Sequence, residues 1–226
     1  MRLAAALAFP VALAAQSPVV PASVAPLSPQ DEAKTFVLPP GYRAQLVASE
    51  PMVIEPAACN WDADGHLYVA ELRTYVQDVD GNGTDEPRSR IVRLTDRDGD
   101  GTMDEAVTFI DGLVLPRMVL PLDDRVLVME TYAGILWSYR DRDGDGRADD
   151  REQVFDYGKS GANLEHQDSA LSWGIDNWLY SAMGAKRLRI GKDGKLVGEE
   201  VPHEFAQWGI ALDDLGRAYF ASGGAE

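Results

Sequence analysis

The sequence predicts an all-β fold, specifically a β-propeller of four-stranded blades, and three observations support this prediction. First, one strand-turn-strand pattern recurs four times, with an apolar strand, a turn of Asp, Asn or Gly, and an alternating apolar strand. Second, the spacing of the copies suits blades, which typically repeat every ~40–50 residues. Third, the chain after residue 41 has no convincing helical period. The copies span residues 57–71, 118–130, 170–183 and 209–222.

The intervals between the copies favour blades over other all-β folds. The equivalent strand positions Leu67, Val126, Leu179 and Ala218 lie 59, 53 and 39 residues apart. The two longer intervals contain extra Asp-rich loops, which account for their length. A two-sheet sandwich gives no reason for four similar hairpins at blade spacing. Because a propeller closes its ring to remove sheet edges, about four blades interrupted at Glu226 predict part of a larger ring, of the six-bladed type.

Three segments make up the predicted domain organisation. Residues 1–15 predict a signal peptide, with a positive residue, a short apolar run and small residues for cleavage. Residues 16–27 are rich in Pro, Ala and Ser and predict an extended linker. Residues 28–226 form the propeller domain, incomplete at its C-terminus, which begins with a short helix capped by Ser28. We therefore expect an exported protein, periplasmic or extracellular, with no later segment apolar enough to span a membrane.

The charge and the cysteine content exclude some classes of function. The formal net charge is −16, from 37 acidic and 21 basic residues. This argues against nucleic-acid binding, which needs a basic face, and against adhesion to anionic lipid. Cys59 is the single cysteine, so no internal disulfide can form, and its apolar neighbours predict a small core residue.

Two Asp-rich loops predict structural calcium sites that rigidify long loops. Oxygen donors at positions 1, 3, 5 and 9 can wrap a hard cation, and glycine at position 6 permits the sharp turn. The second loop also has an acidic residue at position 12, where the first has Val107. Asp and Gly also favour ordinary turns, so the alternative is that these loops bind no metal. For a weaker copy of the pattern at residues 78–86, a calcium site and an ordinary turn are equal alternatives. The predicted ligands are Asp96, Asp98, Asp100 and Asp104 in the first loop, and Asp141, Asp143, Asp145, Asp149 and Glu152 in the second.

His166 is the candidate catalytic residue. It lies between polar neighbours just before the third repeat, so we expect it on a loop at a strand end, where propellers line their central funnel. Histidine titrates near neutral pH and can take a proton from an alcohol. The alternative is a loop histidine that makes a structural hydrogen bond.

Four further polar residues are predicted to bind substrate in the same funnel. Arg117 precedes the second repeat much as His166 precedes the third, and Gln167 follows the histidine directly. Glu71 ends a strand and Arg73 follows it closely. A ring of Glu and Arg could hold a polyol by paired hydrogen bonds. The alternative is ion pairing between blades, above all for Glu130 at the equivalent strand end.

The run from His166 to Gly184 resembles a known enzyme family. Its His-Gln pair, its Gly-Ile-Asp-Asn turn and its Leu-Tyr strand ending near glycine are similar to the corresponding segment of soluble quinoprotein glucose and sorbosone dehydrogenases. In that family the histidine accepts the proton of the sugar hydroxyl, so the resemblance gives His166 this role. The resemblance also suggests pyrroloquinoline quinone as a cofactor. Its Arg-Asn pair and Gln ligand, however, align with Phe205, Ala206 and Gly223, so the visible quinone ligands are not matched.

Over residues 28–226 the chain is similar to the N-terminal propeller domain of a planctomycete and verrucomicrobial family named as membrane-bound dehydrogenases. Larger members add helical repeats and a c-type cytochrome domain. The resemblance therefore implies a sugar or alcohol substrate, and a cytochrome c domain or another electron acceptor as partner. The matching pieces are LPPGYRAQLVASEP, NWDADGHLYVAELRTY, DVDGNGTDEP, GLVLPR, the Asp loops, LEHQDSALSWGIDNWLYSA and QWGIALDDLGRAYF.

Three functions stay open at this point. The first is an exported sugar or alcohol oxidoreductase in which His166 removes the hydroxyl proton. The second is a non-enzymatic propeller, stabilised by calcium, that binds a carbohydrate or a protein. The third is a lactonase-like hydrolase that uses a metal held by residues such as Glu71 and Asn163.

Overall fold

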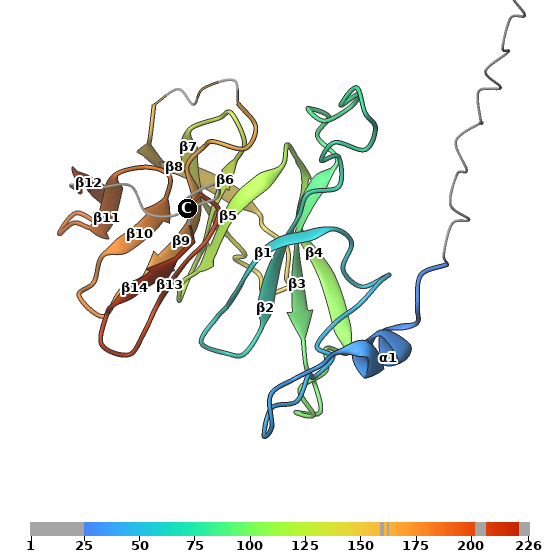
Figure 1. The fold of residues 1–226 in the computed structure, drawn as a ribbon. Coiled ribbons are helices and arrows are strands. Elements are labelled where there is room, and N and C mark those ends of the chain that lie inside the picture. The colour runs from blue at the N-terminus through green and yellow to red at the C-terminus, as the bar shows by residue number, and fades with distance from the viewer. Residues whose placement is uncertain (1–24, 159–160, 162, 202–206, 222–226) are drawn as a thin grey trace, which may run out of the picture.

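The computed structural model describes residues 25–158, 161, 163–201 and 207–221. The predicted signal peptide and residues 16–24 of the predicted linker lie outside these residues. Within the described part, no helix is both long and apolar enough to cross a bilayer. The chain consists of a row of antiparallel sheets with a short helix, α1, to one side (Figure 1).

Four antiparallel sheets follow one another along the chain, and each has its strands in sequence order. Among the described residues three sheets have four strands and the last has two. The first sheet is β1(Pro56–Trp61), β2(Leu67–Glu71), β3(Ser89–Thr95) and β4(Glu105–Leu113). The second is β5(Pro116–Pro121), β6(Val126–Glu130), β7(Ile135–Arg140) and β8(Asp150–Asp156). The third is β9(Ser169–Trp173), β10(Leu179–Ala182), β11(Lys186–Ile190) and β12(Leu196–Glu200), and the fourth is β13(Ile210–Leu212) and β14(Ala218–Phe220).

The sheets meet through their first strands. β1 contacts β5, β5 contacts β9, and β9 contacts β13. Sheets that stand side by side around their innermost strands are the blades of a β-propeller, and the ribbon shows this order (Figure 1). The predicted fold class is therefore confirmed. The repeat is confirmed at the same residues, because Leu67, Val126, Leu179 and Ala218 are the first residues of β2, β6, β10 and β14.

The core lies between the blades. Strand β6 shows how side chains that alternate between the two faces of a strand contribute to the core on both sides. Val126 and Val128 pack on one side, with the core residues of the first blade. Leu127 and Met129 point the other way and pack with Leu171 and other residues of the third blade. Successive side chains of a strand face opposite sides of the sheet, so a central blade needs apolar residues at every position. Each fully buried aliphatic side chain contributes roughly 1.5–3 kcal/mol.

The hairpin turns carry the Asp and Gly residues that the repeat pattern contains. Asp62 and Asp213 each accept two backbone N–H groups of their own turn through Oδ1. Near the end of each of these two turns, one residue has a positive backbone φ angle: 85° at Gly65 and 75° at Gly216. Glycine adopts this conformation without the steric cost of a Cβ, and the third hairpin uses Asn177, at 63°.

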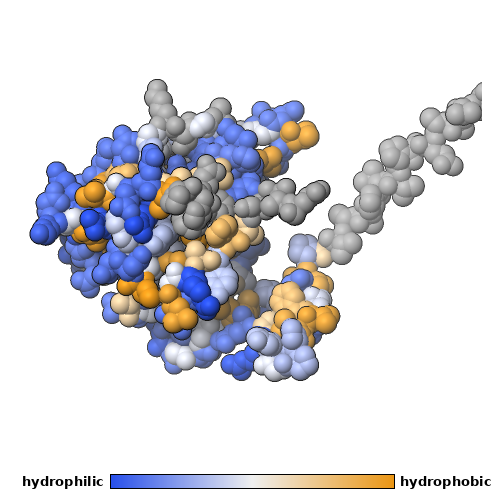
Figure 2. Space-filling model, turned by 60° about the vertical axis from the view of Figure 1, so that its left-hand side comes forward, coloured by the Kyte–Doolittle hydropathy of each residue, from blue (hydrophilic) through white to orange (hydrophobic). Residues whose placement is uncertain are grey.

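The short helix α1(Pro29–Glu32), followed by the 3₁₀-helix η1(Ala33–Thr35), begins where the sequence predicts. Ser28 is the N-cap, and its side chain accepts a hydrogen bond from the Asp31 N–H. Hydrophobic side chains gather on the part of the surface that carries α1, as Figure 2 shows, and Phe36 and Val37 are among the exposed ones.

The prediction that Cys59 is a core residue is wrong. The side chain is exposed on β1, the first strand of the first blade. Its neighbours Ala58 and Asn60 face the second blade, where the Asn60 side-chain amide donates to the Val119 carbonyl at 2.6 Å. Cys59 therefore points to the opposite side, on which Trp61 is also half exposed.

Candidate functional site

The candidate site lies where the first strands of the second, third and fourth blades begin. Arg117 is the second residue of β5, His166 precedes β9, and Trp208 precedes β13. The guanidinium of Arg117 joins these segments: its Nη1 donates to the Leu164 carbonyl at 3.0 Å, and its Cζ lies 4.3 Å from the centre of the Trp208 ring. We call the residues Arg117, Leu164, Glu165, His166, Gln167 and Trp208 the Arg117 cluster.

Arg117 is buried, with only 2% of its surface exposed. Its Nε and Nη2 have no hydrogen-bond partner among the described residues. Burial lowers the pKa of Arg117 to about 10, and the nearby Asp168 carboxylate and Tyr132 raise it in opposition. A buried donor without a partner costs roughly 1–3 kcal/mol, more for a charged group, so such a group points to a function other than stability.

Gln167 fixes the loop that precedes β9. Its side chain is buried, its Oε1 accepts the Tyr132 N–H at 2.6 Å, and its Nε2 donates to the carbonyls of Gly161 and Asn163 at 3.3 and 3.1 Å. The predicted substrate-binding amide is thus occupied by backbone groups. It holds the loop against the second blade instead.

His166 lies on this loop with its side chain exposed. Its imidazole has no hydrogen-bond partner in the described part of the chain, whereas the side chains of the residues before and after it both form hydrogen bonds. Glu165 Oε2 accepts the Trp208 indole N–H at 3.2 Å, and Gln167 is fixed as described. A free imidazole on a restrained loop can accept a proton from a ligand hydroxyl.

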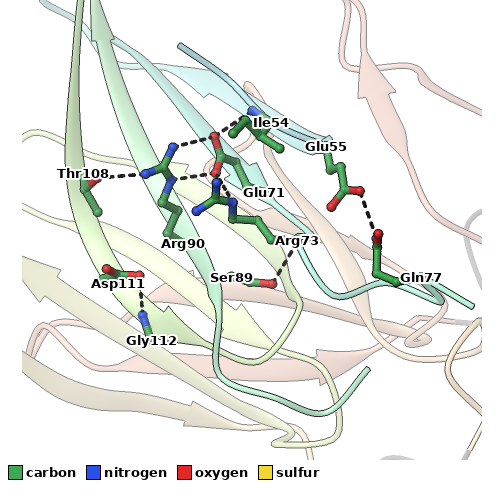
Figure 3. Close-up of polar contacts among 10 residues, drawn as sticks. All are labelled: Ile54, Glu55, Glu71, Arg73, Gln77, Ser89, Arg90, Thr108, Asp111 and Gly112. Carbon is green, nitrogen blue, oxygen red and sulfur yellow. Dashed lines mark hydrogen bonds and ion pairs between the residues drawn. The ribbon is translucent and has the colours of Figure 1, made fainter. Parts of the chain in front are cut away.

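Glu71 and Arg73 lie in a separate network of the first blade (Figure 3). Glu71 is fully buried, and its Oε2 accepts a hydrogen bond from Arg90 Nε at 2.6 Å. Its Oε1 accepts the Ile54 N–H at 2.9 Å and Arg90 Nη2 at 3.3 Å, and Arg73 Nε lies 3.5 Å from Oε2. Both oxygens are therefore saturated. Among the described residues no hydrogen bond or ion pair joins this network to the Arg117 cluster.

Glu130 holds the place in the second blade that Glu71 holds in the first. Its Oε1 accepts the Val114 N–H at 2.6 Å, as Glu71 Oε1 accepts the Ile54 N–H. Val114 and Ile54 each lie two residues before the first strand of their blade. The acidic residue that ends the second strand thus ties the start of its own blade.

The two Asp loops connect β3 to β4 and β7 to β8, between strands as the sequence predicts. Each brings three carboxylates together, with one oxygen of each within 4.8 Å of the others. The Gly101 N–H, followed by other backbone N–H groups of the loop, lowers the pKa of Asp96. The same pattern of backbone hydrogen bonds recurs in both loops, so they have one conformation. The two groups are Asp96, Asp98 and Asp104, and Asp141, Asp143 and Asp149.

Three predicted calcium ligands lie outside these groups. Asp100 and Asp145 each accept the backbone N–H two residues ahead, at 2.7 and 2.8 Å. Glu152 lies on β8, and its Oε2 is 3.7 Å from Arg140 Nη1. In the weaker copy, Asp78 accepts backbone N–H groups of its own turn, and no group of three carboxylates forms within residues 78–86, all of which are described.

The sequence did not single out three residues that shape these sites. Arg93 lies beside the second Asp loop, with Nη1 3.8 Å from Asp141 Oδ2. At the first loop the neutral side chain of Gln45 takes the equivalent place, and its Nε2 donates to the Asp100 carbonyl at 3.3 Å. Trp208 is not among the predicted site residues, and its contact with Arg117 has no sequence signal beyond its position before a first strand.

Solved structures similar to this chain are β-propellers. A gluconolactonase from Xanthomonas campestris matches with a TM-score of 0.50 and 16% identity, over 77% of this chain and 56% of that one. An auxiliary nutrient binding protein from Bacteroides ovatus matches with a TM-score of 0.46 and 16% identity, over 72% and 36%. The PQQ domain of pyranose dehydrogenase from Coprinopsis cinerea matches with a TM-score of 0.40 and 14% identity, over 59% and 28%. At this identity the similarity to the gluconolactonase shows the fold alone, and the chain spans about half of that protein's length.

No curated protein matches the sequence. One family model does, over nearly the whole of the predicted propeller domain. It is described as a domain of unknown function, DUF7133, and it covers residues 28–225. The chain therefore belongs to the DUF7133 family.

Proposed function

We propose that the Arg117 cluster is the substrate site of an exported sugar or alcohol oxidoreductase, and that His166 accepts the proton of the substrate hydroxyl. The observation that carries the proposal is the exposed imidazole, which has no hydrogen-bond partner among the described residues, on a loop that is held on both sides by Gln167 and Glu165. A base that needs no rearrangement to meet its substrate contributes typically 10²–10⁴-fold to a proton-transfer step.

Each residue of the cluster has a part in this scheme. His166 takes the hydroxyl proton as the carbon gives up hydride to a redox acceptor. Arg117 supplies fixed donors toward the substrate oxygens, and Trp208 holds the guanidinium plane by stacking. Gln167 keeps the loop in place through backbone contacts.

The described residues do not form a complete site for pyrroloquinoline quinone. That cofactor carries three carboxylates, and Arg117 is the one cation within the Arg117 cluster. The positions that align with quinone ligands, Phe205, Ala206 and Gly223, lie outside the described residues and carry no polar side chain. The roles proposed for His166 and Arg117 therefore do not depend on this quinone.

A metal-dependent lactonase is less well supported by this geometry. Both oxygens of Glu71 are occupied by Arg90 and the Ile54 N–H, and Asn163 Oδ1 accepts the Glu165 N–H at 2.9 Å. Within the described ranges, the groups of acidic residues that could hold an ion lie in the two Asp loops. These observations favour the oxidoreductase.

We expect the full-length protein to reduce a dye with a sugar or alcohol when electron acceptors are supplied, and His166→Gln to lower kcat by about 10²–10⁴-fold with little change in substrate binding. The matched control is His66→Gln, because His66 lies in a hairpin turn with Nδ1 2.9 Å from Asp62 Oδ2. Full activity of His166→Gln would remove the proposed base. Binding of sugar without turnover, under every acceptor tried, would favour a binding propeller.

We further propose that the two Asp loops hold calcium as a structural ion. The converging carboxylates and their position between strands support this. Because the Arg93 guanidinium repels a cation near Asp141, we expect the first loop to be the tighter site.

Calcium is expected to raise the unfolding free energy by about 2.7 kcal/mol per site at a concentration of 100 Kd. Calorimetric titration of protein stripped with chelator should give heat for each site, and scanning calorimetry should show the higher melting temperature. Asp96→Asn and Asp141→Asn should each remove one binding event, whereas Asp78→Asn should remove none, since no group of three carboxylates forms within residues 78–86, all of which are described. A melting curve that calcium leaves unmoved would refute the structural role.

A further inference from the structure

The unpartnered edge of Arg117 has a specific shape. Nη1 donates to the Leu164 carbonyl, and Nε and Nη2 have no hydrogen-bond partner within the described ranges. These two N–H groups lie along one edge of the planar guanidinium and point the same way, so they match the two oxygens of one carboxylate. The hydroxyls of a neutral sugar can also accept from these donors, but they carry no charge to compensate the buried guanidinium.

The surroundings of this edge favour a singly charged anion. The Trp208 ring covers one face of the guanidinium, so its orientation is fixed and water is excluded there. Asp168 is close enough to interact electrostatically with Arg117, and Glu165 is held nearby by Trp208. Two acidic neighbours disfavour a dianionic phosphate more than they disfavour a carboxylate.

We infer that the Arg117 cluster takes a carboxylate-bearing sugar or hydroxy acid, with the carboxylate on Nε and Nη2 of Arg117 and a hydroxyl at His166. The inference rests on the proposed function for the hydroxyl end of the ligand. Since Arg117 is 2% exposed, an ion pair formed at this edge is shielded from water.

Calorimetry with matched ligands tests the inference. The probes are galacturonate, glucuronate and gluconate, each compared with its neutral counterpart: the methyl ester for the uronates and glucose for gluconate. For the full-length protein at least one acid should bind about tenfold more tightly than its neutral partner. Arg117→Gln should abolish this preference, and Arg117→Lys, which keeps the charge but not the two-donor edge, should retain only part of it.

A matched control is Arg151→Gln. Arg151 also stacks on a tryptophan, with Cζ 4.4 Å from the Trp137 ring, but on the exposed outer strand β8, so the acid preference should survive. The inference is overturned if acids and neutral partners bind alike, if Arg117→Gln keeps the preference, or if a crystal grown with the acid shows only ordered water on Nε and Nη2.

The same measurements separate this inference from the proposed function. His166→Gln should keep the acid preference while it loses turnover. Acid-selective binding without any turnover would support the carboxylate site and refute the oxidation. Turnover of neutral sugars, with no preference for acids in binding, would support the oxidation and refute the carboxylate site.

Discussion

Replacing Glu71 with alanine is expected to lower the free energy of unfolding by about 3–5 kcal/mol. The carboxylate is fully buried and joins three parts of the first blade: Ile54 before β1, its own strand β2, and Arg90 on β3. Alanine would leave the Ile54 N–H and the Arg90 guanidinium, only 20% exposed, without their acceptor. Urea unfolding followed by circular dichroism measures the loss.

Three control variants separate the charge from the hydrogen bonds. Glu71→Gln keeps an acceptor for Ile54 and should lose less than alanine. Glu130→Gln should lower the free energy of unfolding by less than Glu71→Gln does. Glu130 Oε1 also accepts a backbone N–H, but the residue is not fully buried. Glu86→Gln breaks an exposed pair with Arg88 and should change stability by less than about 1 kcal/mol. Equal effects for Glu71→Ala and Glu86→Gln would contradict a structural role for the buried pair.

Gly134→Ala is expected to destabilise the second blade by about 3 kcal/mol or more. Gly134 has a φ of 62°, which already penalises a side chain. An added Cβ would also lie 1.9 Å from the Gly158 carbonyl oxygen, a backbone atom that cannot rotate away. The Gly134 carbonyl accepts the Tyr157 N–H at 2.8 Å, so the two segments cannot separate without breaking that bond. Thermal unfolding should show a lower melting temperature.

Gly65→Ala is the matched control for this prediction. Gly65 has a φ of 85°, but nothing lies within 4 Å of an added Cβ. Only the backbone penalty of about 1–2 kcal/mol is then expected. If the two alanine variants unfolded at the same temperature, the close approach of Gly158 to Gly134 would make no difference to stability.

The blades could be predicted from the sequence because the patterns that indicate them are local. An alternating strand, a turn with Asp and Gly, and a second strand are read within about 15 residues, and β2, β6, β10 and β14 begin at the predicted equivalent positions. The Asp loops are local in the same sense, since the hydrogen bonds that shape them lie within one loop.

The contacts of the candidate site could not be predicted because they join distant segments. Arg117 and Leu164 are 47 residues apart, and nothing near either residue encodes the contact. Glu71 was expected in a ligand funnel, but the Arg90 that binds it lies 19 residues later on the next strand. The loop position of His166 followed from sequence, whereas the lack of a partner for its imidazole among the described residues depends on which neighbours the fold brings close.

The contacts of Arg117 also bear on how the fourth blade is kept in order. In a linear array each repeat touches only its neighbours, so one unit can open without disturbing units beyond those neighbours. Arg117 skips one blade, because it bonds the loop before the third and stacks on the tryptophan before the fourth. Fraying of β13 and β14 would therefore uncover the guanidinium in the second blade. By thermodynamic linkage, a ligand that binds this guanidinium only while Trp208 is stacked on it slows amide exchange in the hairpin of β13 and β14, although it contacts neither strand.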